Sequence, residues 1–431
     1  MIDLAYRDRQ RQGGFDFEAL ETATRSVLHA CGAMVLEYLL EMEDGSALSR
    51  SCPCGGSFLD HKRQEKTVRS VLGPLQLRRT RQRCNRCGSW RVPEDLLLDV
   101  VKTGFSPGLR RMMAKSGSEL SFERAGSLLE ELAGVQVTPK EIERVSEKIG
   151  GDIARWQQAQ VERAMQAQPP GVEIPQAPQT LCIAQDATGV PVLRRETEGR
   201  KGKAADGQAR TREVKLGAVF TQSTADAEGP PVRDPQSTTY VGKIETAESF
   251  GPRLYSEAVQ RGLEKASRVV VLGDGAPWIW NLAEEHFPGA IQILDFYHAQ
   301  EKLCGLAKLL HPENPVARQA WLDPLAELLW EGQIPALLQR LRRLRSHPAE
   351  VKTTLEYFQN NQQRMRYGQF RAQNLFIGSG VVEAGCRSVI GERLKKSGMH
   401  WSVRGANAII ALRCCIESHR FEDYWQERRA A

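Results

Sequence analysis

The strongest constraint on this fold is a change of hydrophobic pattern across a proline-rich segment. Residues 166–179 contain Pro169, Pro170, Pro175 and Pro178, and they cannot hold a helix because proline lacks the backbone N–H that a helix needs. Before this segment the apolar residues recur mainly at helical spacing, whereas after it short apolar runs alternate with helical stretches. We therefore expect a linker at 166–179 between an N-terminal region and an α/β domain.

The pattern after the linker predicts a mixed sheet in the order strand, strand, strand, helix, strand, helix, strand. The strands are expected at residues 180–185, 214–220, 238–244, 268–272 and 291–294, and the helices at 252–263 and 277–286. The polar, basic stretch 194–212 is expected to be an exposed excursion between the first two strands. Residues 299–366 have helical periodicity, and a last helix opens at 378–380 and runs through 394. An all-helical block thus interrupts the α/β domain.

Three smaller elements are expected before the linker. Residues 17–42 have apolar side chains at helical spacing, which predicts a long amphipathic helix. Residues 51–97 carry two cysteine pairs that flank an alternating stretch, which predicts a hairpin around Gly73. Two helical patterns at 123–132 and 139–149 are separated by a short break, and together they predict a helix–turn–helix.

Positive charge is concentrated in the predicted hairpin. The whole chain has a formal net charge of only +6, but ten Lys or Arg residues lie between His61 and Pro93 against Glu65 alone. Such a segment favours a polyanion as partner. No apolar run approaches the roughly 18 residues that a membrane span needs, and the first residues are charged. We therefore expect a soluble, unsecreted, cytoplasmic protein.

The two cysteine pairs form a candidate structural metal site. Cys52 and Cys54 make a C-x-C pair, and Cys84 and Cys87 make a C-x-x-C pair, with the basic hairpin between them. Four thiolates can close a tetrahedral Zn²⁺ site, which would stabilise a segment too small to have a core of its own. The single residue inside the first pair strains the usual knuckle, so a ligand role for His61 and unligated surface cysteines both stay open as alternatives.

Three acidic residues stand at the ends of predicted elements in the α/β domain. Asp186 ends the first strand, Asp274 ends the fourth, and Glu383 lies in the first turn of the last helix. If the first and fourth strands are neighbours, both aspartates emerge at one end of the sheet and the helix can add the third carboxylate. Carboxylates this close repel unless a cation lies among them, and oxygen ligands of this kind suit Mg²⁺ or Mn²⁺.

Each acid also has a plain structural explanation. An aspartate at a strand end often forms a turn, and a glutamate in a first helical turn complements the helix dipole. Asp295 and His298 follow the last strand near the same sheet edge, where a histidine either has a structural role or orients a phosphate or carboxylate. The basic residues Arg393, Lys395 and Lys396 are either a solvated helix face or contacts to a DNA backbone.

Three blocks of this sequence resemble bacterial insertion-sequence transposases of the ISKra type. The blocks are GDGAPWIW at 273–280, ILDFYHA at 293–299, and GSGVVEA at 378–384 with RLK at 393–395. The order of predicted elements, with two aspartates and a helix-borne glutamate, is similar to the RNase H-like DDE transposases. The helical block before the glutamate is similar to that of their Mutator-like branch. The resemblance extends over about residues 39–425.

The resemblance implies specific roles. Asp186, Asp274 and Glu383 would be the catalytic triad and would hold two Mg²⁺ or Mn²⁺ ions. Asp295 and His298 match the D-x-x-H element of Mutator-like enzymes. The position seven after the glutamate, where several transposase groups carry a basic residue, is Ile390 here. Arg387, one turn beyond Glu383, is the candidate that takes over phosphate or metal-site support.

The resemblance implies a multidomain α and α/β protein that acts on DNA. Its parts would be an N-terminal helix at 1–50, a zinc-ribbon-like module at 51–100, a helix–turn–helix region at 101–165, the linker at 166–179, an RNase H-like catalytic domain at 180–298, an all-helical insertion at 299–375, and closing helices at 376–431. The implied activity is cutting at the ends of a mobile element and joining the 3′-hydroxyl ends to target DNA. Pairing two ends calls for a homodimer or a larger assembly on double-stranded DNA.

The N-terminal modules would bind the terminal inverted repeats of the element. The candidate DNA contacts there are Arg78, Arg79, Arg81 and Arg83 in the hairpin and Lys140 and Arg144 in the second helix of the helix–turn–helix. Two other functions stay open: a DNA-binding regulator that keeps the shell of a transposase without its activity, and an RNase H-like nuclease that hydrolyses DNA without joining it.

Overall fold

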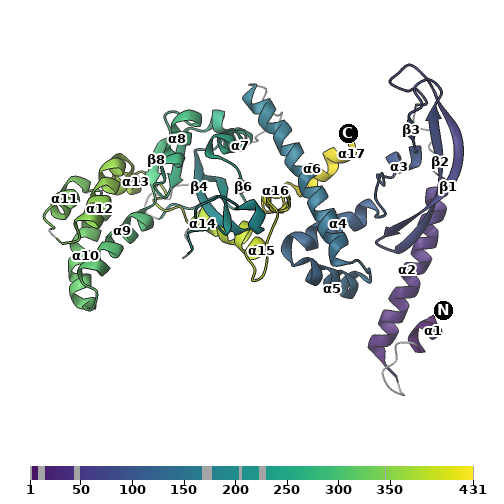
Figure 1. Ribbon diagram of the computed structural model, residues 1–431, viewed down its shortest axis with the longest axis horizontal. Helices are drawn as coiled ribbons and strands as arrows, with labels where there is room; N and C mark the ends of the chain where they lie inside the picture. The colour runs from purple at the N-terminus through teal and green to yellow at the C-terminus, as the bar shows by residue number, and fades with distance from the viewer. Residues whose placement is uncertain are drawn as a thin grey trace. The chain divides into compact units, whose positions relative to one another are not determined.

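A computed structural model describes residues 2–7, 15–42, 49–166, 177–202, 206–222, 230–344 and 346–430 of the chain. It contains two compact units, Met1–Ile149 with Arg429–Ala431, and Gly150–Arg428 (Figure 1). Most of the linker expected at 166–179 lies outside the described residues. Among the described helices, none combines the length and the apolar character that a membrane crossing requires.

The first unit combines helices with a three-stranded sheet. Its helices are α1 (Ile2–Arg7), α2 (Phe17–Glu41), α3 (Pro93–Leu97), α4 (Pro107–Glu119), α5 (Phe122–Ala133) and the first part of α6 (Pro139–Met165). Its strands are β1 (Phe58–Ser70), β2 (Gly73–Cys84) and β3 (Trp90–Arg91), in that order in the sheet. The predicted long helix and hairpin are confirmed. The hairpin turn is at residues 71 and 72, because Ser70 pairs with Gly73.

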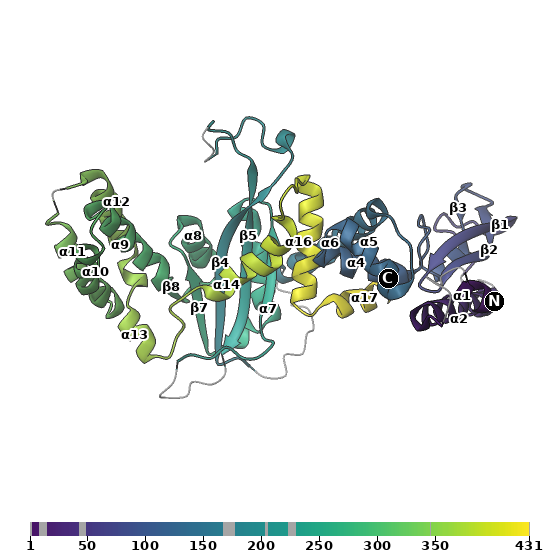
Figure 2. The same ribbon diagram turned by 90° about the horizontal axis from the view of Figure 1, so that it is seen from below.

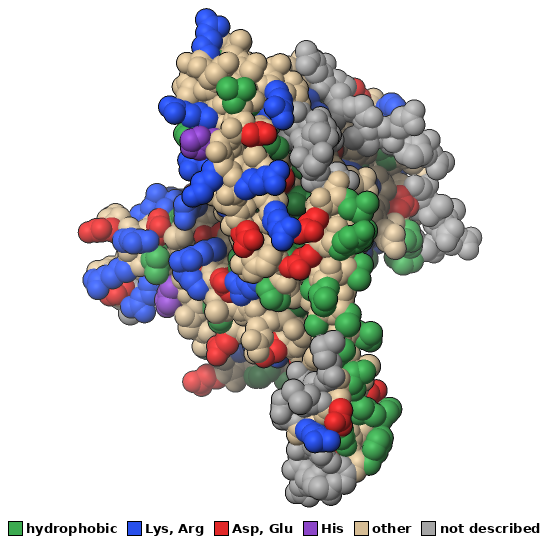
Figure 3. Space-filling model, turned by 90° about the vertical axis from the view of Figure 1, so that its right-hand side faces the viewer, with side chains coloured by type: hydrophobic (Ala, Val, Ile, Leu, Met, Phe, Trp, Pro, Cys, Tyr) green, Lys and Arg blue, Asp and Glu red, His purple; other side chains and the backbone are tan. Residues whose placement is uncertain are grey.

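The hairpin buries opposite faces at its two ends. Near the turn, Val68, Leu75 and Leu77 pack against Ala33 of α2. At the other end, Phe58 packs with Cys52 and Cys84 instead. These are two small cores, and between them the strand residues are largely exposed. The far side of α2 carries exposed apolar side chains, which run down the lower right of Figure 3.

The predicted pair of helices at 123–132 and 139–149 is observed as α5 and α6. Gly134, with φ of 66°, ends α5 in the left-handed region that glycine tolerates best. Thr138 and Glu141 then exchange side-chain hydrogen bonds with each other's backbone N–H, at 3.3 and 2.9 Å, and so cap α6. Helix α6 continues to Met165, beyond its predicted end, because Ile153 and Val161 extend its buried stripe.

The second unit is built on a five-stranded sheet in the order β6-β5-β4-β7-β8. The strands are β4 (Thr180–Pro191), β5 (Thr211–Gln222), β6 (Thr239–Lys243), β7 (Arg268–Gly273) and β8 (Ile291–Leu294). The first three are antiparallel, whereas β7 runs parallel to β4 and β8 runs parallel to β7. All five predicted strands are confirmed, and the first and fourth of them are neighbours.

Helices surround the sheet and extend from one of its edges. Helices α7 (Ala247–Gln260) and α8 (Pro277–His286) connect the strands, and α9 (Phe296–Leu310), α10 (Pro315–Trp330), α11 (Ile334–Leu341), α12 (Pro348–Asn361) and α13 (Tyr367–Ala372) form the helical block beside β8 (Figures 1 and 2). The chain then returns through α14 (Gly380–Gly385), a π-helical segment (Cys386–Gly391), α15 (Glu392–Leu394), α16 (Val403–Glu417) and α17 (Phe421–Ala430). The predicted helical interruption of the α/β unit is therefore observed.

Two neighbouring glycines of α6 test the packing of the second unit. A Cβ atom on Gly150 would lie 2.0 Å from the backbone oxygen of Ala408 in α16, whereas one on Gly151 would meet only the end of the Arg155 side chain at 3.9 Å. We expect Gly150→Ala to destabilise the protein by about 2 kcal/mol or more, because α16 must move. Gly151→Ala should stabilise it by up to about 1 kcal/mol through helix propensity. Calorimetric unfolding of both full-length variants checks this, and equal shifts would contradict it.

Candidate functional site

The parallel pairing of β4 and β7 brings Asp186 and Asp274 to the same level of the sheet. The last paired residues are Ala184 and Leu272, and each aspartate lies two positions beyond its member of that pair. Asp186 stays within β4, where it pairs with Leu216 of β5. The chain leaves β7 before Asp274, whose carboxylate accepts a hydrogen bond from the backbone N–H of Ala276 at 2.9 Å.

The environment of Asp186 includes the charge of Asp274. Burial raises the pKa of Asp186, hydrogen bonds from the Ala187 N–H and the Cys386 thiol lower it, and the charge of Asp274 raises it further. The net shift is upward, so the site disfavours negative charge at Asp186 when no cation is present. A cation between the two carboxylates would remove this penalty.

A second acidic group adjoins the first. Ligand atoms of Asp295, His298 and Glu383 all lie within 4.8 Å of one another. Asp295 is fully buried and caps α9, since its Oδ1 accepts from the His298 N–H at 2.8 Å. Its Oδ2 accepts from the backbone N–H and the hydroxyl of Ser379. The same hydroxyl lies 2.9 Å from Glu383 Oε1, and its single proton can be donated to one of the two carboxylates at a time.

His298 connects the two acidic groups. Its Nδ1 lies 3.3 Å from Asp295 Oδ1 and 3.8 Å from Glu383 Oε1. The hydrogen bond with Asp295 raises the pKa of His298 to about 9 against the opposing effect of burial, and the charges of Asp295, Glu383 and Asp274 contribute to the rise. The charge of His298 in turn lowers the pKa of Asp186.

The arrangement differs in one respect from the expected triad. His298 interacts electrostatically with all four predicted acids, but the group within ligand distance is Asp295, His298 and Glu383, and Asp186 and Asp274 do not belong to it. Burial would raise the pKa of Asp295, yet its hydrogen bonds from His298 and Ser379 hold that pKa below the ordinary value. Asp295 is thus an anion that orders its neighbours and is itself hidden from solvent.

Sequence reasoning assigned no role to three other residues at this site. Ser379 contacts Asp295 and Glu383, and its position directly before the helix that carries Glu383 is a signal in the sequence. The Tyr357 hydroxyl from α12 donates to the backbone oxygen of Asp274 at 3.3 Å. The Cys386 thiol contacts Asp186, and nothing in the local sequence indicates either of these last two contacts.

The basic residues after Glu383 have different environments. Arg393 is fully buried, with its guanidinium 5.0 Å from the centre of the Trp401 ring, so its predicted DNA contact is wrong. The chain folds back after α15, and Trp401 Nε1 donates to the Leu394 oxygen at 3.1 Å, which covers this arginine. Lys395 is exposed and donates to the hydroxyl of Thr188 on β4. Lys396 is half-buried and Arg387 is exposed, and their roles stay predictions.

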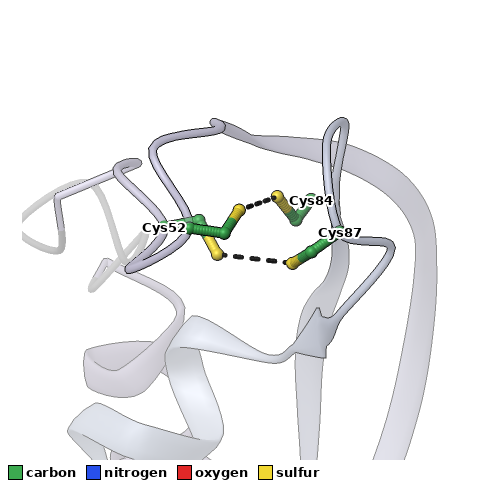
Figure 4. Close-up of side chains that lie close together, drawn as sticks. Cys52, Cys84 and Cys87 are labelled. Atoms are coloured by element: carbon green, nitrogen blue, oxygen red, sulfur yellow. Dashed lines mark hydrogen bonds between the residues drawn. The ribbon is translucent and has the colours of Figure 1, made fainter.

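The four predicted zinc ligands come together at the base of the hairpin (Figure 4). All four cysteine sulfurs lie within 4.8 Å of one another. The distance from Cys52 to Cys87 is 3.7 Å, and that from Cys54 to Cys84 is 3.5 Å. Sulfurs around a tetrahedral Zn²⁺ are about 3.8 Å apart, given a Zn–S bond of about 2.3 Å. The group can therefore hold Zn²⁺.

Local backbone geometry explains why Cys52 and Cys54, although only one residue apart, can both belong to the four-cysteine group. Gly55 has φ of 81°, and a Cβ atom on Gly56 would lie 2.9 Å from the Cys84 sulfur, so only glycine permits this close approach of the two cysteine loops. Backbone N–H groups of Cys87 and Arg86 lower the pKa of Cys84. The hydroxyl and backbone of Ser89 lower the pKa of Cys87 to about 6. These groups favour the thiolate form of Cys84 and Cys87, which is the form that binds metal.

His61 is not a member of the cysteine group. It occupies a bulge between Asp60 and Lys62 in β1, and its ring packs edge-on against Trp90 with centroids 4.9 Å apart. The alternative in which His61 replaces a cysteine is therefore wrong for the described geometry.

The predicted DNA contacts of the first unit are unequally available. Arg79 is 18% exposed and forms an ion pair with Asp95 at 2.7 Å, so it has a structural partner. Arg81 and Arg83 are exposed and lie 4.0 and 5.4 Å from the Trp90 ring. Arg78 is 75% exposed beside Glu41.

Arg81 also stands directly opposite Lys62 in the hairpin. Opposed like charges destabilise a hairpin unless an anion lies near. In α6, Lys140 pairs with Glu143 at 2.8 Å, and Arg144 is exposed.

Comparison with known proteins does not identify a family for this chain. No protein-family model matches the chain, and no curated protein matches it. A chain from the Drosophila P element transposase strand transfer complex is similar over 78% of this chain and 84% of its own, with 11% sequence identity and a TM-score of 0.24. A TM-score this low carries no argument about function.

Removing one cysteine of the group should abolish metal binding. We expect the purified wild type to hold about one Zn²⁺ per chain and Cys84→Ser to hold almost none, because three ligands cannot close a structural site. The hairpin module should also unfold at a lower temperature. Cys31→Ser, which changes an exposed cysteine outside the group, is the control. Elemental analysis with thermal unfolding measures both, and zinc retained by Cys84→Ser would contradict the assignment.

We expect the imidazole of His298 to titrate well above the ordinary range for histidine, because carboxylates surround it. The raised pKa means that the protonated imidazole stabilises the metal-free fold fully below its ordinary value of 6.5, and this contribution is lost as the pH rises through about 9. Asp295→Asn should return the midpoint toward 6.5. Burial lowers the pKa of His286, which serves as the internal control and should not respond to Asp295→Asn. NMR titration of the imidazoles measures both, and a wild-type His298 midpoint near 6.5 would refute the prediction.

Proposed function

We propose that this chain is a DNA transposase of the DDE type, with Asp186, Asp274 and Glu383 as its catalytic acids. The observation that carries the proposal is the in-register parallel pairing of β4 and β7, which sets two aspartates from distant segments at one level of the sheet. The sheet order, with three antiparallel strands followed by two parallel ones, supports an RNase H-like domain. The helical block before Glu383 supports the Mutator-like branch.

The donor set fits a divalent cation. Asp186 and Asp274 are carboxylates that repel each other, and Glu383 is exposed at the same site and held through Ser379. Hard oxygen donors of this kind are the ligands that Mg²⁺ and Mn²⁺ prefer. Two bound ions would activate the attacking oxygen and stabilise the leaving oxygen of a phosphodiester.

The remaining residues position the acids and the DNA. Asp295 accepts from the backbone N–H groups of His298 and Ser379 at a buried position, which leaves the Ser379 hydroxyl able to donate to Glu383. His298 is protonated at neutral pH in the metal-free protein. Its positive charge can face a phosphate oxygen. Lys395, bound to Thr188 two residues beyond Asp186, adds a second cation beside the same strand.

The first unit is proposed to bind the ends of the mobile element. The cysteine group would hold Zn²⁺ and stabilise the hairpin, and the exposed Arg78, Arg81 and Arg83 would contact phosphates. Arg144 on the exposed side of α6 would reach the bases or backbone of the same site. Pairing two element ends would require at least two copies of the chain.

Asp274→Asn should separate catalysis from DNA binding. The substrate is a supercoiled plasmid that carries this coding sequence with its flanking genomic DNA, and cleavage is measured with Mg²⁺. We expect the cleavage rate to fall by about 1,000-fold or more, because a metal ligand is lost. This corresponds to about 4 kcal/mol of transition-state stabilisation, at about 1.4 kcal/mol for each tenfold in rate. Binding of the same DNA in a gel shift should be unchanged.

The matched control is Glu264→Gln, an exposed acid just before the amino end of β7, which should cleave normally. Wild-type binding without any Mg²⁺-dependent cleavage would favour the regulator. Cleavage without joined products would favour the nuclease. Loss of binding in Asp274→Asn would make that carboxylate structural.

A further inference from the structure

The described residues of the connection between β4 and β5 form an arm. Residues 192–210 make up this arm, of which 192–202 and 206–210 are described, and Figure 2 shows it projecting beyond the sheet. It contains a 3₁₀ turn (Arg194–Glu196) and a bridge between Lys201 and Gln208. The Ala209 N–H also donates to the Arg200 oxygen at 3.1 Å. Backbone hydrogen bonds therefore join the two described segments of the arm.

The arm carries more positive charge than its own acids can balance. Its exposed cations are Arg194, Arg195, Arg200, Lys201 and Arg210. The acids among its described residues are Glu196, Glu198 and Asp206, and Asp206 pairs with Arg210 at 3.2 Å. Within the described residues, no ion pair engages Arg194, Arg195 or Arg200. Three guanidinium groups are thus available for an external anion.

Three of these cations surround a hollow. The hollow has a volume of about 540 Å³, and it is lined by the three arginines together with one acid, Glu198, and the polar residues Thr197 and Gln208. Arg212, at the start of β5, lies close enough that burial and the charge of Arg200 lower its pKa. Crowded guanidinium groups repel one another unless an anion lies between them. Their planar donor forks match the oxygens of a phosphate.

The base of the arm is bound to the elements that carry the acids. Leu193 N–H donates to the Trp401 oxygen at 2.9 Å, and Trp401 N–H donates to the Pro191 oxygen at 3.2 Å. Trp401 belongs to the segment that follows the helix of Glu383, and the arm itself continues the strand of Asp186. Phosphates held by the arm would therefore lie at a set position relative to both acids.

We propose that the arm is a binding site for the phosphate backbone of double-stranded DNA, with Arg194, Arg195 and Arg200 as its contacts. The inference rests on the proposed function, because it assigns the arm to the DNA that flanks the bond to be cut. Contacts of guanidinium groups to phosphates are independent of base sequence. The arm would therefore hold any duplex and leave recognition of the element ends to other parts of the chain.

Salt-dependent binding of an arbitrary duplex tests the arm. The probe is a short fluorescein-labelled DNA of unrelated sequence, and the full-length protein is titrated by anisotropy without Mg²⁺ at about 50 to 200 mM NaCl. We expect Arg195→Glu and Arg200→Glu each to weaken binding by about tenfold at the lowest salt. Each should also reduce the slope of log K against log [NaCl] by about one, as the loss of one phosphate contact predicts.

Lys265→Glu is the matched control, since it makes the same charge change at an exposed lysine before the amino end of β7. Arg195→Gln separates a lost contact from added repulsion and should still reduce the slope. If the arm variants bind as Lys265→Glu does, the arm proposal is overturned and the catalytic proposal is unaffected. If the arm variants lose binding as expected but the wild type never cleaves the plasmid, only the proposed activity fails. A wild type that binds no duplex at the lowest salt overturns both.

Discussion

The second unit depends on the pairing of β4 with β7. Although β5, β6 and α7 lie between them in the chain, β4 and β7 pair in parallel and in register. This pairing alone sets Asp186 beside Asp274 at one end of the sheet. The burial of the strands stabilises this arrangement, since Ile183, Val271 and their neighbours are fully buried. That apolar burial offsets the repulsion between two carboxylates that elementary electrostatics would keep apart. The acids are therefore held together by a sheet whose stability does not depend on them.

A buried anion organises the rest of the site. Asp295 accepts hydrogen bonds from two segments distant in sequence, at His298 and Ser379, and so joins the start of α9 to the start of α14. An ionised carboxylate without solvent is costly unless it is fully hydrogen-bonded, which makes this contact sensitive to substitution of either partner. Glu383 lies in the first turn of α14, so this contact helps to position it. The geometry of this site thus depends on a residue that is hidden from solvent.

The hairpin of the first unit has little apolar burial to stabilise it. It has two small cores on opposite faces and a largely exposed middle, so apolar burial alone holds little of it. The cysteine group closes the end farther from the turn, where Phe58 has few apolar neighbours. With its ends held, the hairpin can present Lys62 opposite Arg81 and keep Trp90 among arginines. Charges that would destabilise a free hairpin are then available to a polyanion.

The sequence by itself determined the strands, the helices, the hairpin, the cysteine pairs and the acids at strand ends, because hydrophobic period and turn chemistry are local properties. From the sequence, the two aspartates were expected to meet only if the first and fourth strands are neighbours. The sheet order shows that these strands are neighbours. Only the tertiary structure decided which charged residues are free. Arg393 is covered by Trp401 and Arg79 pairs with Asp95, although both belong to basic clusters that resemble solvated faces. Burial and pairing depend on side chains that arrive from other segments, and that information is absent from any local pattern.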